Sequence, residues 1–391
     1  MLGSQKFSVI QPTSIHFGVG MIENLGRIVR DSGGGKVLLV LDPNLESVGL
    51  TDKITGPLVK DGIPYEIFSH IDPEPGLKLA DEGAEIAGKM GADCVVGVGG
   101  GSAMDVAKAI AVLVTNGGKA KDYLGLGKIK KPGLTKIMVP TTAGTGAEVT
   151  FTAVFINEET GSKGGMNGDP LYPDAALLDP ALTLTLPPQV TAAPGIDALT
   201  HALEAYVSTQ SHAVSDMYAW EAMELISANL GQAYANGDNL EARSAMLLGS
   251  LLAGKALATA GVGLVHAMAY PLGGMFGIPH GLANAVLLPY VVDYNIVGNP
   301  VKFADIAVLL GNEIKGASLR EAAGSAVDAV WNLNRDVNIP TSMAALDIPR
   351  EKIPEMAEIA LTVTRPVENN PRKPTLEEVI KIYETAFEGW G

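Results

Sequence analysis

The chain has 391 residues, 47% of them hydrophobic and 18% charged, enough for two globular domains with large cores. Its formal net charge is −15 and its only cationic cluster is "KIKK" at 128–131, so neither a nucleic acid nor an anionic membrane surface is expected as a partner. No apolar run approaches the ~20 residues of a membrane-spanning helix, and the first twelve residues lack the features of a secretory peptide. Cys94 is the single cysteine and has no partner for a disulfide within the chain. A cytoplasmic protein is therefore expected, with Cys94 as a small buried hydrophobe.

The first half of the chain alternates between near-continuous apolar runs and amphipathic stretches. The strands are expected over 36–42, 65–70, 92–101 and 135–143, and the helices over 50–61, 77–91 and 102–116. This alternation predicts an α/β domain with a Rossmann-like parallel sheet covered by helices on both faces.

The second half reads differently. Strand-like runs vanish after the proline pair Pro187 and Pro188, and helical patterns rich in Ala, Leu and Met continue to the C-terminus. We therefore divide the chain into an α/β domain, 1–186, and an all-α domain, 187–391.

A glycine-rich turn lies between the third expected strand and its helix. Glycines let backbone N–H groups approach a phosphate closely, and the following helix N-terminus adds unpaired donors. Asp105, three residues beyond Ser102, suggests a capping box at this helix start. The turn is not the GxGxxG fingerprint of a first βα turn, so it is either a phosphate site or a tight turn without a ligand. It comprises Gly99, Gly100, Gly101 and Ser102.

Two further segments follow strands. Asp42 ends the strand 36–42, where a carboxylate can accept hydrogen bonds from adenosine ribose hydroxyls and repel a 2′-phosphate; the alternative is an ordinary turn residue. The segment "VPTTAGTGAEVT", 139–150, is rich in glycine and hydroxyl groups. Because ligands lie at the carboxyl ends of strands in open α/β sheets, both segments are expected to converge on the glycine turn.

Four side chains suggest a metal site. Asp197 and His201 are spaced i, i+4 and share one face of a helix. His266 and His280 lie fourteen residues apart, and the intervening glycines and prolines should break the helix so that both imidazoles face a common point. One carboxylate and three imidazoles suit Fe²⁺ or Zn²⁺ better than Mg²⁺ or Ca²⁺ and leave room for water or substrate; the alternative is satisfied buried histidines. Glu204 is either a hydrogen-bond acceptor for these groups or a solvated helix charge.

Over essentially the whole chain these motifs resemble the iron-containing (group III) alcohol dehydrogenases. The motifs, in the family's order and spacing, are "GGGSAMDVAKAIA", "VPTTAGTGAEVT", "LLDPALTLTLPP", "GIDALTHALEAYVS", "GLVHAMAYPLGGMFGIPHGLANAVLLP" and "NNPRKPTLEEVIKIYETAF". The resemblance implies an NAD-binding α/β domain, an all-helical domain of the dehydroquinate synthase-like fold, a cleft between them, and a homodimer or larger homo-oligomer. It also implies a divalent metal, usually iron with zinc as the alternative, held by Asp197, His201, His266 and His280.

The resemblance assigns further residues to the site. The cofactor is expected to contact Asp42, Gly99, Gly100, Gly101, Ser102, Asp105, Thr141, Thr142, Thr145, Lys163 and Leu182. The substrate is expected near Thr152, Leu257 and Pro366.

Three positions depart from the family pattern. Tyr270 replaces a second histidine often assigned to proton relay, and because tyrosine is a poorer base at neutral pH, proton exit could use water or a ribose hydroxyl. Leu257 replaces a frequent phenylalanine. Glu74 stands in "PEP" where relatives often have "PNP".

The function expected is NAD-linked, metal-dependent interconversion of a small primary alcohol or diol and its aldehyde. The side chains expected around the substrate, Leu257, Pro366 and Thr152, are mostly apolar. They favour unbranched chains of about three to four carbons, because each added methylene that they bury strengthens binding. Glycerol dehydrogenase-like enzymes are a close rival. A dehydroquinate synthase-like elimination needs cationic side chains around a substrate phosphate. The expected helices that carry the four candidate metal ligands are nearly free of Arg and Lys, apart from Lys255, so this reaction is disfavoured. A non-enzymatic scaffold is disfavoured because the ligand set and the glycine turn are both intact.

Overall fold

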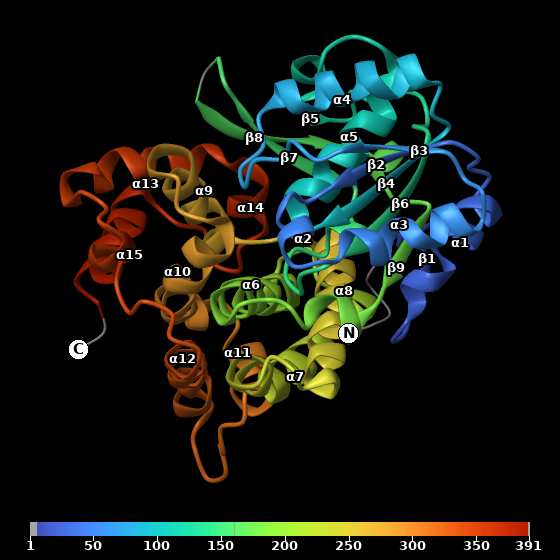
Figure 1. The fold of residues 1–391 in the computed structure, drawn as a ribbon. Coiled ribbons are helices and arrows are strands. Elements are labelled where there is room, and N and C mark those ends of the chain that lie inside the picture. Colours follow the sequence, from blue (N-terminus) through green and yellow to red (C-terminus); the bar gives the residue numbers. More distant parts are fainter. Residues whose placement is uncertain (1–5, 160, 390–391) are drawn as a thin grey trace. The chain divides into compact units, whose positions relative to one another are not determined.

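The computed structural model describes residues 6–159 and 161–389, which form two compact units (Figure 1). One unit runs from Gln11 to Thr185, and the other holds everything described from Leu186 onward together with residues 6–10. The sequence division had placed residues 6–10 in the α/β domain. They group with the helical unit, where the Phe7 ring stacks on His212 with the centroids 3.8 Å apart.

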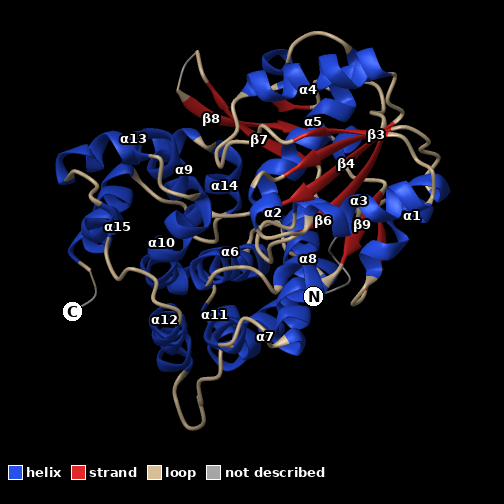
Figure 2. Ribbon diagram, viewed as in Figure 1, coloured by secondary structure: helices blue, strands red, loops and turns tan. Residues whose placement is uncertain are grey.

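The α/β unit is built on a six-stranded sheet in which every pairing is parallel (Figure 2). In spatial order the strands are β1 (Ser14–Phe17), β9 (Ala175–Leu178), β6 (Thr135–Pro140), β4 (Cys94–Gly99), β2 (Val37–Leu41) and β3 (Tyr65–Phe68). The predicted Rossmann-like parallel sheet is thus confirmed. The short strands β1 and β9 were not foreseen.

Helices cover both faces of this sheet. They are α1 (Leu25–Asp31), α2 (Asn44–Ser47), α3 (Thr51–Lys60), α4 (Leu77–Met90) and α5 (Gly101–Asn116). Every residue of β2 is buried, and alternate side chains enter opposite cores: Leu38 and Val40 pack with α4 and α5, whereas Leu39 packs with α1 and α3. This two-residue alternation with burial on both sides explains why the strand reads as a continuous apolar run. Cys94 is fully buried, and burial raises the pKa of its thiol.

A second, smaller sheet contains β5 (Gly125–Leu126), β8 (Ser162–Asn167) and β7 (Thr152–Asn157). Strands β7 and β8 pair antiparallel, and β5 joins β8 in parallel. This sheet was not predicted. It carries two of the expected site residues, Thr152 and Lys163.

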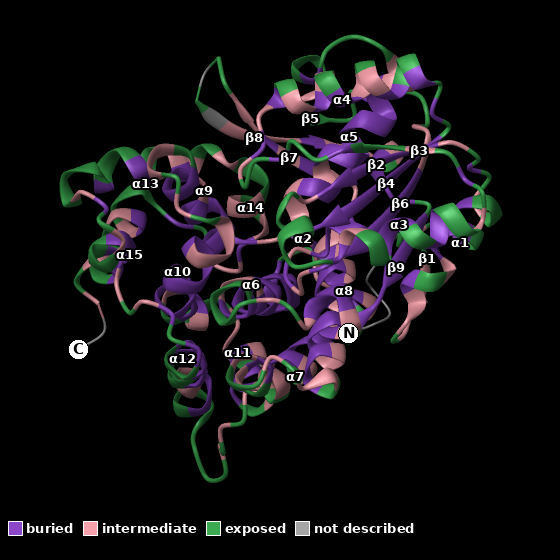
Figure 3. Ribbon diagram, viewed as in Figure 1, coloured by how far each residue is buried: buried purple, intermediate pink, exposed green. Residues whose placement is uncertain are grey.

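From Leu186 onward the described part of the chain contains helices and loops but no strand, as predicted for the C-terminal domain. Its helices are α6 (Pro188–Val207), α7 (Ala213–Ala235), α8 (Leu240–Ala260), α9 (Leu264–Phe276), α10 (His280–Asn295), α11 (Pro300–Leu309), α12 (Leu319–Asp336), α13 (Ile353–Thr362), α14 (Thr364–Asn369) and α15 (Leu376–Glu388). Pro188 is the first residue of α6, because proline at this position has the right φ and no N–H is needed there. Figure 3 shows that the inner helices of this unit are buried along much of their length.

Two buried polar contacts hold the helices that carry the site. Arg243 of α8 donates through Nη1 to Thr191 Oγ1 of α6 at 2.6 Å. The hydroxyl of Tyr383, fully buried in α15, donates to the Met268 carbonyl of α9 at 2.6 Å. Among the described residues, no single helix is long and apolar enough to cross a membrane; α8 and α9 pass such a test only as a pair bent by 104°.

Candidate metal centre and cofactor site

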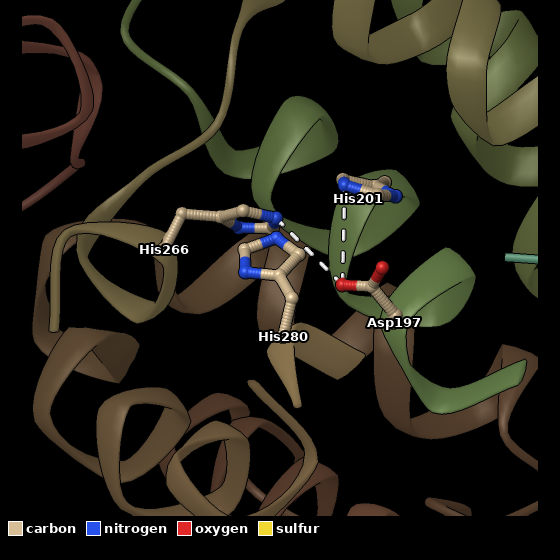
Figure 4. Close-up of side chains that lie close together, drawn as sticks. All are labelled: Asp197, His201, His266 and His280. Carbon is tan, nitrogen blue, oxygen red and sulfur yellow. Dashed lines mark ion pairs between the residues drawn. The ribbon is translucent and has the colours of Figure 1, made fainter. Parts of the chain in front are cut away.

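Asp197, His201, His266 and His280 come together in the helical unit, as Figure 4 shows. Asp197 and His201 lie one turn apart on α6, His266 lies in the first turn of α9, and His280 is the first residue of α10. One ligand atom from each residue can be chosen so that all lie within 4.8 Å of one another. A single metal ion can therefore reach all four side chains.

The break between α9 and α10 is what brings His280 to the cluster. Helix α9 ends at Phe276 and is capped by Gly277, whose φ of 67° is the left-handed conformation that glycine adopts readily; Pro279 precedes α10. Pro271, one of the prolines between His266 and His280, was also predicted to contribute to this break. That part was wrong, because Pro271 lies inside α9, so the interruption is shorter than predicted.

The electrostatics of the cluster suit a divalent cation. Asp197 Oδ1 lies 3.9 Å from His201 Nε2 and 3.8 Å from His266 Nε2. Burial opposes ionisation of Asp197, but the three histidines and a hydrogen bond from Asn284 outweigh it, so its pKa lies below the usual range. A buried carboxylate facing three imidazole nitrogens is the donor set that Fe²⁺ and Zn²⁺ accept.

Glu204 is buried and holds His266 in place, so its interpretation as a solvated charge is wrong. Its Oε2 lies 2.6 Å from His266 Nδ1 and accepts from the Gly263 N–H at 2.8 Å. Its Oε1 accepts from the Val265 N–H at 2.6 Å. The carboxylate thus receives unpaired donors at the start of α9 and leaves His266 Nε2 facing the cluster.

Asn284 is a member of the cluster that the sequence analysis missed. It is fully buried on α10, one turn after His280, and its Nδ2 donates to Asp197 Oδ1 at 2.6 Å. The same nitrogen lies 3.2 Å from His266 Nε2 and 3.3 Å from His280 Nε2. The i, i+4 spacing of His280 and Asn284 could have indicated this residue, because it places both side chains on one face of a helix.

The expected substrate residues belong to both units. In the helical unit, Tyr270 lies one turn after His266, with its ring centroid 6.4 Å from that of His280. Leu257 on α8 and Pro366 on α14 are half-buried, and α14 packs against α9. Thr152 lies in the α/β unit, where its hydroxyl donates to Asn167 Oδ1 at 2.8 Å.

In the α/β unit the glycine turn joins β4 to α5. The predicted capping box is wrong: α5 begins at Gly101, and no side chain caps it. The Ser102 hydroxyl instead donates to the Pro73 carbonyl at 2.6 Å. Asp105 accepts from the Val154 N–H at 2.9 Å and pairs with the buried Lys108 at 2.8 Å. The two residues therefore anchor neighbouring segments, and the helix N-terminus keeps its backbone donors.

Close packing explains Gly99 and Gly101 of this turn, whereas a Cβ on Gly100 would make only an ordinary contact. Gly99 has a φ of 150°, and a Cβ there would lie 2.7 Å from Asp42 Cβ. A Cβ on Gly101 would lie 2.7 Å from Thr145 Cγ2, and one on Gly100 would lie 3.5 Å from Thr142 Oγ1. The end of β2, the turn and the segment after β6 thus lie side by side.

The order of the strands in the sheet also indicates a ligand site at this location. The chain leaves β2 for β3 on one side and then returns to β4 on the other side of β2. Such a reversal opens a crevice at the carboxyl ends of the two strands, where open α/β sheets bind ligands. Asp42 and Gly99 lie at those two strand ends, and the Thr141 N–H donates to the Gly99 carbonyl at 2.9 Å.

Lys163 and Leu182 are placed by other interactions. Lys163 on β8 is nearly buried, and its Nζ lies 2.5 Å from Glu74 Oε2, the residue of the unusual "PEP". Leu182 is fully buried among core side chains, and its N–H donates to the Asp179 carbonyl at 3.0 Å.

Comparison with known proteins identifies the family. A sequence profile described as "Iron-containing alcohol dehydrogenase" matches residues 12–180, and one described as "Fe-containing alcohol dehydrogenase family, C-terminal" matches 191–387. The chain is 42% identical to long-chain-alcohol dehydrogenase 1 of Geobacillus thermodenitrificans over 97% of both chains. It is 40% identical to 1,3-propanediol dehydrogenase of Klebsiella pneumoniae, covering 98% of this chain and 99% of the relative. A crystal structure of 1,3-propanediol oxidoreductase superposes with a TM-score of 0.95 at 40% identity, covering 98% of this chain and all of the other. The chain belongs to the iron-containing alcohol dehydrogenase family and is an oxidoreductase of that family.

Proposed function

We propose that this enzyme interconverts a small primary alcohol or diol and its aldehyde, with NAD as the hydride carrier and Fe²⁺ as the metal, Zn²⁺ being the alternative. The observation that carries the proposal is the buried carboxylate and three-imidazole cluster on α6, α9 and α10. Relatives support the substrate class, since they include proteins named 1,3-propanediol dehydrogenase, NAD-dependent methanol dehydrogenase and lactaldehyde reductase. A solved relative named sulfoacetaldehyde reductase contains NAD⁺, which supports the cofactor.

Asp197, His201, His266 and His280 would hold the metal. The bound metal would supply Lewis-acid polarisation of the alcohol or carbonyl oxygen. Glu204 fixes the orientation of His266, which keeps Nε2 directed at the ligand cluster. Tyr270 lies beside His280, and we assign it to orient the hydroxyl group of the substrate. Because tyrosine is a poor base at neutral pH, the proton of that hydroxyl would leave through water or a ribose hydroxyl.

The glycine turn would bind the NAD pyrophosphate. Gly99, Gly100, Gly101 and Ser102 present backbone N–H groups at an α5 N-terminus that carries no side-chain cap, and such a terminus attracts anions. Thr141, Thr142, Thr145, Lys163 and the main chain of Leu182 would line the rest of the site, with Asp105 supporting it from behind.

Asp42 would bind the adenosine ribose. Its Oδ1 accepts two hydrogen bonds from Asn44, at 2.9 and 3.0 Å, which fix the carboxylate. Its Oδ2 would accept from ribose hydroxyls and repel a 2′-phosphate, so NAD is favoured over NADP.

We further propose that Leu257, Pro366 and Thr152 bound the substrate, and that the enzyme works in the cytoplasm as a homodimer or larger homo-oligomer. The lone, buried Cys94 supports a reducing compartment.

The test is reconstitution of metal-free protein with Fe²⁺ or Zn²⁺ without oxygen, followed by NADH formation from ethanol, butanol and 1,3-propanediol. We expect metal-dependent activity in the wild type. His201→Ala should lose both metal and activity while keeping its helical circular dichroism, whereas the exposed His70→Ala should keep both. Full metal content in His201→Ala, or metal-loaded wild type inactive on every alcohol, would overturn the proposal.

A further inference from the structure

The loop 69–76, which joins β3 to α4, is fixed against the start of α5. The Pro73 carbonyl accepts from the hydroxyl of Ser102, the second residue of α5, at 2.6 Å. The next proline of the loop is anchored as well, because the Ile156 N–H of β7 donates to the Pro75 carbonyl at 2.9 Å. Glu74 stands between the two anchored prolines, so its backbone is held beside the glycine turn.

The side chain of Glu74 forms an ion pair with Lys163. Its Oε2 lies 2.5 Å from Lys163 Nζ, and the two side chains are only 26% and 8% exposed. Lys163 is directly opposite Ile156 in the antiparallel pairing of β7 with β8, so it lies on the strand next to the one that anchors the loop. Both charges are therefore held in place and largely withdrawn from water, where charges act on their surroundings more strongly than on an open surface.

This pair places a carboxylate close to where the proposed function requires an anion. The pyrophosphate of NAD is anionic, and the uncapped N-terminus of α5 attracts it through backbone N–H donors. The ammonium group of Lys163 would add to that attraction. In this chain the Glu74 carboxylate cancels the charge of Lys163 at short range and itself repels the cofactor, so most of the added attraction is lost.

We propose that Glu74 limits the affinity of the enzyme for NAD(H) by neutralising Lys163 beside the pyrophosphate site. The inference rests on the proposed function in taking the turn 99–102 as that site. Weaker binding of the dinucleotide speeds its release, and product release is the slow step of many enzymes. Glu74 is thus a positioning residue that acts through the charge of its neighbour rather than on a reacting atom.

The test measures the Kd of NADH, from its change in fluorescence on binding, with full-length wild type and four variants. Glu74→Gln keeps the size of the side chain and removes its charge, and Glu74→Asn is a second, shorter neutral variant. Lys163→Met is made alone and together with Glu74→Gln. The control is Glu85→Gln, because Glu85 forms a matched ion pair with Lys89 at 2.6 Å on the exposed face of α4. Circular dichroism establishes that each protein is folded.

We expect Glu74→Gln and Glu74→Asn to bind NADH at least about threefold more tightly than wild type at low salt, because one repelling charge is removed. The gain should shrink as salt rises from about 0.01 M to about 1 M, since the Debye length falls from about 30 Å to about 3 Å. Lys163→Met should bind more weakly than wild type, and Glu74→Gln should recover most of that loss in the double variant. Glu85→Gln should match wild type.

Three results would overturn the inference. Wild-type affinity in Glu74→Gln would show that the carboxylate has no electrostatic effect on the cofactor, and weaker binding would show that it holds Lys163 in a position that favours binding. A gain that is independent of salt would mean that the shape of the loop, rather than its charge, has changed. If Glu74→Gln does not fold, the same criteria apply to Glu74→Asn. Failure of the wild type to bind NADH would overturn the proposed function itself, a result separate from the others.

Discussion

Glu204 on α6 and His266 on α9 form a buried hydrogen bond of 2.6 Å that connects the two helices directly behind the candidate metal ligands. Because the same carboxylate also accepts from the backbone of Gly263 and Val265, it fixes the start of α9 and the ring of His266 together. The position of one candidate ligand is therefore set by a residue that is not itself a member of the four-residue cluster.

Glu204→Gln should weaken metal binding. Glutamine keeps the size, but its NH₂ group would face donors at the start of α9, so His266 loses its fixed orientation. We expect metal affinity to fall by about 10–100-fold, as for other partners of metal-bound histidine. Chelator competition measures this, with the exposed Glu221→Gln as control. Equal affinity in the two variants would mean that His266 is oriented by something else.

Asp42→Asn should relax the preference for NAD. The change removes the charge at the end of β2 and keeps the shape of the side chain, so repulsion of a 2′-phosphate disappears. We expect the ratio of kcat/KM for NADP to that for NAD to rise roughly tenfold, corresponding to about 1.4 kcal/mol. The exposed Asp52→Asn is the control. An unchanged ratio places Asp42 outside the adenosine site.

Leu257→Phe should discriminate against longer alcohols. Phenylalanine fills space beside the substrate that only a longer chain would use. We expect kcat/KM for butanol to fall at least about tenfold relative to that for ethanol, because butanol is two methylenes longer. The measurement is the butanol-to-ethanol ratio in both proteins. A constant ratio, or methanol as the best wild-type substrate, contradicts this view of the pocket.

Glu148→Gln should make stability less sensitive to pH. Burial raises the pKa of Glu148 from an ordinary 4.5 to about 7, against the opposing effect of Lys108. Below about 4.5 both the folded and the unfolded state are protonated, so the shift has no effect there. Between 4.5 and 7 only the unfolded state loses its proton, so the wild type is destabilised as pH rises, by up to roughly 3 kcal/mol at about 1.4 kcal/mol per pKa unit.

Unfolding in denaturant at several pH values checks this. The stability of Glu148→Gln relative to wild type should rise between pH 5 and pH 8 and then level off. The exposed Glu241→Gln should show no such trend. A difference that is constant over this pH range would mean that Glu148 is ionised in the folded protein throughout.

The parts of the fold that could be predicted are those determined by the spacing of residues that are close together in the sequence. Burial on both faces of the sheet makes β2 and β4 continuous apolar runs, and the i, i+4 spacing of Asp197 and His201 is a property of one helix. The small sheet escaped prediction because β5 has two residues and β8 contains two glycines, so neither shows a strand pattern.

The supporting contacts of the site could be predicted only in part, because they join distant segments. One of the two interpretations of Glu204, a hydrogen-bond acceptor for the ligand side chains, holds, but its partner was not specified. Glu204 and His266 are brought together by helix packing, and nothing in either segment alone specifies the pair. Glu74 was noticed only as a departure, yet it pairs with Lys163 across two segments of the α/β unit. Ser102 and Asp105 have the spacing of a capping box, but tertiary partners, Pro73 and Val154, compete successfully for their side chains.

The stacking of Phe7 on His212 has a consequence for synthesis on the ribosome. The helical unit consists of two stretches of chain, separated by the whole of Gln11–Thr185. Phe7 leaves the ribosome about two hundred residues before its partner, a delay of roughly 10–40 s at about 5–20 residues per second. During this time the α/β unit can fold. Residues 6–10 cannot yet pack, because the helical segment that contains His212 has not been synthesised. A fragment that begins at Leu186 would therefore present His212 without its aromatic cover, and a peptide carrying residues 6–10 should bind to it.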